Sequence, residues 1–279
     1  MKQLIRINLS LMFKTKAILL TAFVFILLSV FQAITMLNYS DHLDTSIGGY
    51  FLLSMGGVLI NDNLSRQLAW IGAVIPILFY IYHLIGFAGS YDIFILTRLQ
   101  SRFRWWKAKF VSMTILVVFY GVWLSFIHLV VGVFFFSIKN NWGTLIENQL
   151  SFVFNLQQSA LQINFLALLA FLSGTLAYCA LAQCFALLFR NSHVYYVGVM
   201  IATVLLFGFY SQGLIVRYLS PLNYSSLLDV LQTESQGLRA ANDFTLYNVI
   251  ISILCFMLGQ AFIRKSNFLL NHKGPNGGS

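Results

Sequence analysis

Two histidines are the side chains that could carry proton chemistry inside the long apolar stretches of this 279-residue chain. His83 and His128 each lie in a stretch without Asp, Glu, Lys or Arg. They could act as proton relays or substrate contacts, since ionisable groups at membrane depth commonly mark transport pathways. The alternative, which we favour, is a neutral imidazole that hydrogen-bonds a neighbouring helix. Cys179, Cys184 and Cys255 show no disulfide framework and no zinc-ligand spacing, so we expect them to pack in the interior.

Recognisable enzyme motifs are missing from the sequence. It contains no H-E-x-x-H, no G-x-S-x-G and no aspartate pair within an apolar stretch. The P-loop pattern G-x-x-x-x-G-K-[ST] is also missing, so the chain binds no ATP by that route. We therefore expect no catalytic residue, metal site or cofactor in this chain. Any active transport would draw its energy from another polypeptide.

The most informative segment is residues 91–109, which combines five cations with the adjacent Trp105 and Trp106. Tryptophan together with Lys and Arg suits the lipid headgroup layer, so this could be an ordinary interfacial helix. It could instead be a docking helix that receives mechanical force from a cytosolic partner. In that case Arg102 and Trp105 should dominate, because Trp and Arg are frequent interface hot spots. Lys109 should matter least, because it sits at the boundary of an apolar stretch.

The composition requires a membrane to position these residues. Hydrophobic residues make up 59% of the chain and charged residues 9%, whereas about 25% of the residues in a soluble domain are charged. Six stretches without charge approach or exceed the roughly 20 residues that a membrane-spanning helix needs. We predict an all-α membrane protein with one transmembrane domain over residues 1–273. Its predicted spans are residues 17–37, 68–90, 110–138, 161–189, 194–216 and 246–263.

Three other segments are assigned by length and composition. The first span is longer than the 7–15 apolar residues of a signal peptide, so we interpret it as a retained anchor. Residues 47–60 are apolar but short and glycine-rich, which favours an interfacial or re-entrant segment. The tail 274–279, GPNGGS, is flexible by composition, could be an expression remnant, and receives no function.

The basic residues orient the spans. With the N-terminus inside, thirteen of the 17 Lys and Arg residues lie in cytoplasmic segments and four lie outside. This bias predicts that both termini are cytoplasmic. The net charge of +9 then reflects membrane orientation, and we expect no nucleic-acid partner.

Two motifs resemble those of a known family. Residues 89–107, with Tyr-Asp near the start and S-R-x-x-W-W near the end, resemble the first cytoplasmic loop of ABC-2-type permeases. Such permeases occur in the plasma membrane of Gram-positive bacteria, often beside peptide or bacteriocin genes. Residues 219–224, L-S-P-L-N-Y, are similar to the L-S-P-x-x-Y that precedes the last helix in such permeases.

The resemblance implies half of an exporter for a hydrophobic or amphipathic substrate, plausibly a peptide or antimicrobial. A second permease copy or paralogue and cytosolic ATPase subunits, which bind ATP and Mg²⁺, would complete it. Residues 91–109 would be the coupling helix, residues 1–16 a membrane-surface helix, and residues 225–233 a short external helix. The implied ATPase-coupling residues are Asp92, Arg98, Ser101, Arg102, Trp105, Trp106 and Lys107.

Two other classes of function stay open. One is a non-transport membrane protein, such as an immunity or scaffold protein that binds a partner. The other is an intramembrane enzyme with a site around His83 or His128. The substrate and the choice between a homodimer and a heterodimer of permeases also stay open.

Overall fold

The computed structural model describes a helical chain over most of its length. The described residues are 1–39, 45–57, 64–86, 101–139, 142–149, 159–188, 198, 201–202, 205, 226–233 and 238–265. Within them we find no strand beyond a single bridge between Ser46 and Ser137. The helices are α1 (Lys2–Met12), α2 (Thr15–Tyr39), α3 (Ile47–Met55), α4 (Leu64–Gly86), α6 (Arg102–Phe135), α7 (Thr144–Gln149), α9 (Ala160–Leu188), α11 (Leu227–Thr233) and α12 (Leu238–Lys265).

Four of these helices are long and apolar enough to cross a membrane. They are Lys16–Asn38 in α2, Arg102–Phe135 in α6, Ala160–Leu187 in α9 and Ala241–Arg264 in α12. They coincide with the first, third, fourth and sixth predicted spans. The described chain is therefore all-α and membrane-embedded, as the composition predicts.

The other two predicted spans stay predictions. α4 is helical where the second span was expected, but its described apolar part is only Ala69–Tyr80, which is shorter than a span requires. Most of the fifth span, residues 194–216, lies outside the described residues, as does the tail 274–279.

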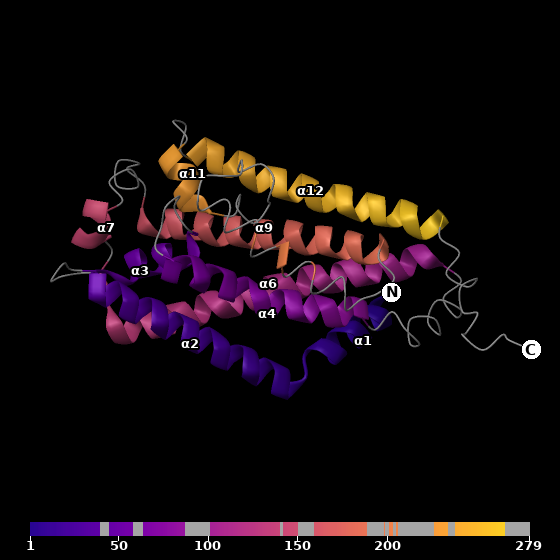
Figure 1. Ribbon diagram of the computed structural model, residues 1–279, viewed down its shortest axis with the longest axis horizontal. Coiled ribbons are helices and arrows are strands. Elements are labelled where there is room, and N and C mark those ends of the chain that lie inside the picture. The colour runs from indigo at the N-terminus through magenta and orange to yellow at the C-terminus, as the bar shows by residue number, and fades with distance from the viewer. Residues whose placement is uncertain are drawn as a thin grey trace, which may run out of the picture.

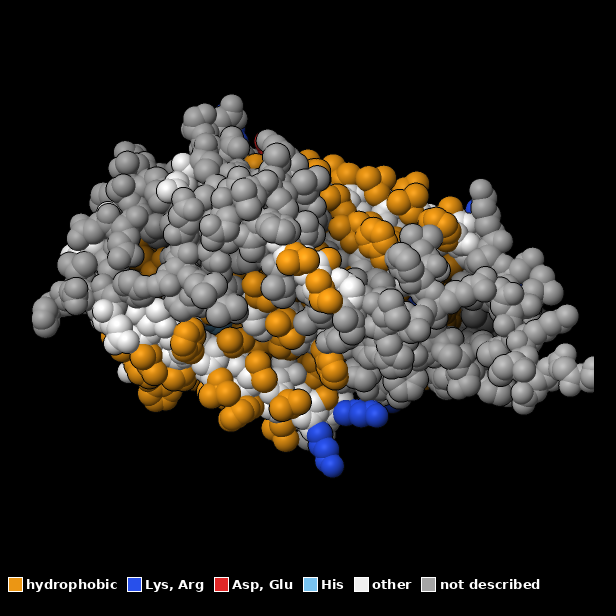
Figure 2. All heavy atoms as spheres, in the orientation of Figure 1, with side chains coloured by type: hydrophobic (Ala, Val, Ile, Leu, Met, Phe, Trp, Pro, Cys, Tyr) orange, Lys and Arg blue, Asp and Glu red, His pale blue; other side chains and the backbone are white. Residues whose placement is uncertain are grey.

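α6 is the central helix of the bundle. It contacts α1, α2, α3, α4, α9 and α12, while α12 lies along α9 in the most extensive helix pairing (Figure 1). α2 and α12 lie at the periphery and expose apolar side chains such as Phe23 and Met257. Hydrophobic side chains accordingly cover the surface over α2 in Figure 2. An apolar outer surface of this kind suits lipid, because water is not the solvent there.

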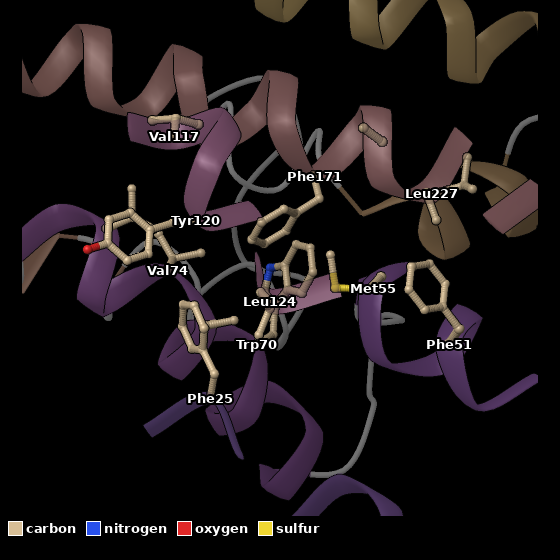
Figure 3. Close-up of a cluster of buried hydrophobic side chains, with 14 of the residues drawn as sticks. Phe25, Phe51, Met55, Trp70, Val74, Val117, Tyr120, Leu124, Phe171 and Leu227 are labelled. Atoms are coloured by element: carbon tan, nitrogen blue, oxygen red, sulfur yellow. The ribbon is translucent and has the colours of Figure 1, made fainter. Parts of the chain in front are cut away.

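Large aromatic side chains fill the space between the central helices (Figure 3). Trp70 of α4 meets Phe171 of α9 edge-on, with ring centroids 5.1 Å apart. Phe25 of α2 and Tyr120 of α6 lie in the same cluster and are fully buried. This packing joins α2, α4, α6 and α9 into one core.

Local sequence sets where two of the helices begin. Ser101 is the N-cap of α6, and its hydroxyl accepts a hydrogen bond from Arg104 N. Before α9, Gln162 N donates to Ser159 Oγ and Ser159 N donates to Gln162 Oε1, both at 3.3 Å. This reciprocal pair is a capping box, which satisfies free amides at a helix start.

α3 is a short buried helix that covers only Ile47–Met55 of the predicted interfacial segment, and residues 58–60 lie outside the described residues. Its nine residues are followed by the C-cap Gly56 and then by Gly57, whose φ of +94° favours glycine. Leu228 N of α11 donates to Gly56 O, which ties the short helix α11 to the end of α3. A helix was expected at residues 225–233, and α11 confirms it.

α1 packs against α6 through one face. Leu4, Asn8 and Met12 recur every fourth residue and are buried. Asn8 Nδ2 donates to Ser112 Oγ of α6 at 3.3 Å, and the ring of Phe13 meets that of Phe119 edge-on at 4.8 Å. The apolar and polar anchors together hold this helix on the bundle.

Candidate functional site: the start of helix α6

The first turns of α6 contain most of the predicted coupling residues. Ser101 caps the helix, and its first turns contain Arg102, Trp105, Trp106 and Lys107. These turns are continuous with the third predicted span. α6 thus begins eight residues before the predicted span start at residue 110. The rest of the predicted coupling segment, including Asp92 and Arg98, lies outside the described residues.

The side chains at the start of α6 separate into two groups. Arg104 and Lys107 are exposed and Arg102 is half-exposed, so the positive charge faces outward. Trp105 and Trp106 are buried, with 7% and 2% of their surfaces exposed. We call Arg102, Arg104 and Lys107 the basic rim of α6. Arg104 was not among the residues that the motif implied, although its charge and its position in the turn could have indicated it.

Trp106 attaches the start of α6 to α12. Its indole Nε1 donates to the backbone oxygen of Phe256 at 2.9 Å. The ring lies against Gly259, where an added Cβ would come within 2.6 Å of Trp106 Cε2. Ile263 and Trp105 complete this small buried cluster. The tryptophans therefore pack within the chain, whereas both sequence interpretations placed them against lipid or a partner.

Lys109 attaches the same segment to α4. Its side chain is buried, and its ammonium donates to the carbonyl oxygen of Leu84. Leu84 lies in the last turn of α4, where carbonyls lack partners inside the helix and the dipole favours a cation. The Lys109 nitrogen also lies 5.6 Å from the centre of the Trp105 ring. Lys109 is thus a central contact, and we no longer expect it to matter least.

A second polar cluster surrounds His128 inside the bundle. His128 Nε2 lies 2.7 Å from Gln32 Oε1 of α2, and Nδ1 lies 2.9 Å from the Leu124 oxygen of its own helix. Nδ1 also lies 3.2 Å from Ser29 Oγ. The phenol of Tyr50 in α3 donates to the backbone oxygen of Ser29 at 2.8 Å. Burial raises the pKa of Tyr50 above its ordinary value, so this hydroxyl keeps the proton that it donates.

The contacts of His128 define its proton arrangement. The Leu124 oxygen can only accept, so Nδ1 carries a proton and donates to it. Gln32 Oε1 faces Nε2 at 2.7 Å; a neutral ring with its proton on Nδ1 accepts at Nε2 when the Gln32 amide is turned so that its NH₂ faces the ring. With both nitrogens engaged and 2% of its surface exposed, His128 has the contacts of a residue that joins helices. This geometry favours the hydrogen-bonded alternative over a proton relay.

The remaining candidate residues are His83 and the three cysteines. His83 lies in α4, but its side chain is outside the described part of the chain. The three cysteines are free thiols, and Cys184 Sγ donates to the Cys255 oxygen across the contact between α9 and α12. Within the described residues, no group of three or more His, Cys, Asp or Glu side chains could hold a metal ion.

Together, the fold and the site define an all-helical membrane protein. One of its long helices begins with exposed basic side chains, and buried side chains in the same turns attach it to two other helices. Comparisons with protein families, with curated proteins and with solved structures find no match for this chain. Any finer assignment rests on the sequence motifs and on the geometry described above.

Proposed function

We propose that this chain is the permease subunit of an ABC-2-type exporter in a bacterial plasma membrane. A separate cytosolic ATPase would bind ATP and Mg²⁺ and drive it, and a second permease chain would complete the path. The exported substrate would be hydrophobic or amphipathic, such as a peptide or an antimicrobial. This chain itself would hydrolyse no ATP.

The observation that carries the proposal is that the start of α6 has exposed cations on one side and buried attachments to two other helices on the other side. Arg104 and Lys107 of the basic rim are exposed and would face an acidic surface, while Trp106 and Lys109 attach the buried side of this helix start to α12 and α4. Because α6 continues without interruption to Phe135, a push on residues 91–101 would move α6 together with both neighbours. A loop that only anchored to lipid would need no such internal attachments.

The alternatives receive less support. An intramembrane enzyme would need an accessible group, and His128 is buried with both ring nitrogens engaged. An immunity or scaffold protein would bind a partner without requiring attachment of the same helix start to two other helices.

Copurification tests the proposal. The tagged chain is purified from its native membranes, and the ABC ATPase that copurifies is measured for two matched variants. Arg104→Glu/Lys107→Glu reverses two rim charges, whereas Lys14→Glu/Lys16→Glu reverses two exposed charges at the α1–α2 junction. We expect the first variant alone to lose the ATPase at equal expression and insertion. Undiminished ATPase binding and transport in the rim variant would reject the coupling role.

A further inference from the structure

A shallow groove runs along the side of α1 that does not face the bundle. Its volume is about 440 Å³, and it is lined by Lys2, Ile5, Arg6, Leu9, Ser10 and Phe13. The face with Leu4, Asn8 and Met12 is already used against α6. The groove is thus a second surface of the same helix.

One end of the groove is cationic. Lys2 and Arg6 are four residues apart, so both side chains lie on the same side of the helix. Both are exposed, and neither has an ion-pair partner among the residues that the structure describes. The first acidic residue of the sequence is Asp41. Two neighbouring exposed cations with no acidic partner in the described part of the chain suit an anionic group such as a phosphate.

Beside these cations the groove has an apolar side, which continues toward α2. Ile5, Leu9 and Phe13 follow at intervals of four residues, which places them beside one another. The ring of Phe13 is fixed by its edge-on contact with Phe119. Beyond it, Leu19 and Leu20 of α2 expose about two thirds of their surfaces. In Figure 2, Lys and Arg side chains project beside the hydrophobic surface near the junction of α1 and α2.

We propose that this groove is a binding site for an anionic phospholipid. The headgroup phosphate lies between Lys2 and Arg6, and one acyl chain follows Ile5, Leu9 and Phe13 toward the exposed face of α2. A soluble phosphate would use only the cationic end, and a zwitterionic lipid would gain less from two cations. This site does not depend on the proposed transport function.

Native mass spectrometry of the purified full chain tests the site. The probes are phosphatidylglycerol and phosphatidylcholine with the same acyl chains, titrated separately. We expect the first bound phosphatidylglycerol to be preferred, and Lys2→Gln/Arg6→Gln to weaken it by more than about ten-fold, since each cation near an anionic headgroup contributes about five-fold. Phosphatidylcholine binding should change little in this variant.

The matched control is Lys14→Gln/Lys16→Gln, which removes two exposed cations outside the groove. Equal loss of phosphatidylglycerol in both double variants would show charge attraction without a site and would overturn the proposal. So would displacement of the lipid by inorganic phosphate, because the acyl chain would then contribute nothing. Leu9→Gln should weaken both lipids, and no effect on either would also overturn the proposal. Thermal midpoints of all variants verify that they are folded.

Discussion

Trp106 of α6 fills the space that Gly259 leaves on α12, and a Cβ at that position would come within 2.6 Å of Trp106 Cε2. We predict that Gly259→Ala displaces the indole and lowers stability by about 1–3 kcal/mol, the usual cost of overpacking. The thermal midpoint of the purified protein measures the effect. Gly198→Ala is the control, since a Cβ there meets no described atom within 4 Å. Equal midpoints for the two variants would contradict the packing.

Lys109→Met should separate α6 from the end of α4. The substitution keeps the length of the side chain but leaves the Leu84 carbonyl without its charged donor. Hydrogen bonds to charged groups contribute roughly 1.5–3 kcal/mol, so we expect a loss of that size and impaired coupling. Lys109→Arg should retain more stability, because it keeps a cation. If exposed Lys107→Met lowers the thermal midpoint equally, the contact with α4 has no special role.

The contacts around Ser29 predict coupling between His128 and Tyr50. His128 approaches the Ser29 hydroxyl, and Tyr50 donates to the Ser29 backbone oxygen. The His128 and Tyr50 rings are also stacked, with centroids 6.0 Å apart. Polar contacts between membrane helices contribute about 0.6 kcal/mol on average, so His128→Leu and Tyr50→Phe should each be modest. A double-mutant cycle should give a coupling energy above about 0.5 kcal/mol, whereas strict additivity would show that the two residues act independently.

The distribution of basic residues predicts the sidedness of the loops. In a variant without the native cysteines, a cysteine at Gln100 should react only from the cytoplasm. Cysteines at Asn63, Asn141 and Ser235 should react with an impermeant reagent on intact cells. The physical basis is the retention of Lys and Arg on the cytoplasmic side. Labelling of Gln100 from outside would reverse or reject this topology.

Long apolar runs were sufficient to predict α2, α6, α9 and α12, because in lipid a backbone without water must satisfy its own hydrogen bonds. The start of α6 was less predictable. Its cations suggest a boundary at residue 110, yet Ser101 caps the helix and the charged turns simply continue it.

The burial of Trp105 and Trp106 could not be predicted from the sequence around them. The acceptor of the Trp106 indole, Phe256, is 150 residues away, and Gly259 carries no signal of its own. His128 is a similar case, since Gln32 is 96 residues distant. Local patterns identify residues that need a partner, but only the packing of distant helices shows which partner they have.

The length of α6 has a consequence for the lipid that surrounds the protein. Its 34 residues extend about 51 Å at 1.5 Å per residue, while the hydrocarbon core is roughly 30 Å thick. Even without its charged first turns, the apolar part is longer than this core. A helix of this length tilts, kinks, thickens the bilayer locally or extends past the headgroups. Because α6 contacts α1, α2, α3, α4, α9 and α12, any change in its tilt that follows a change in bilayer thickness would be passed to all of these helices.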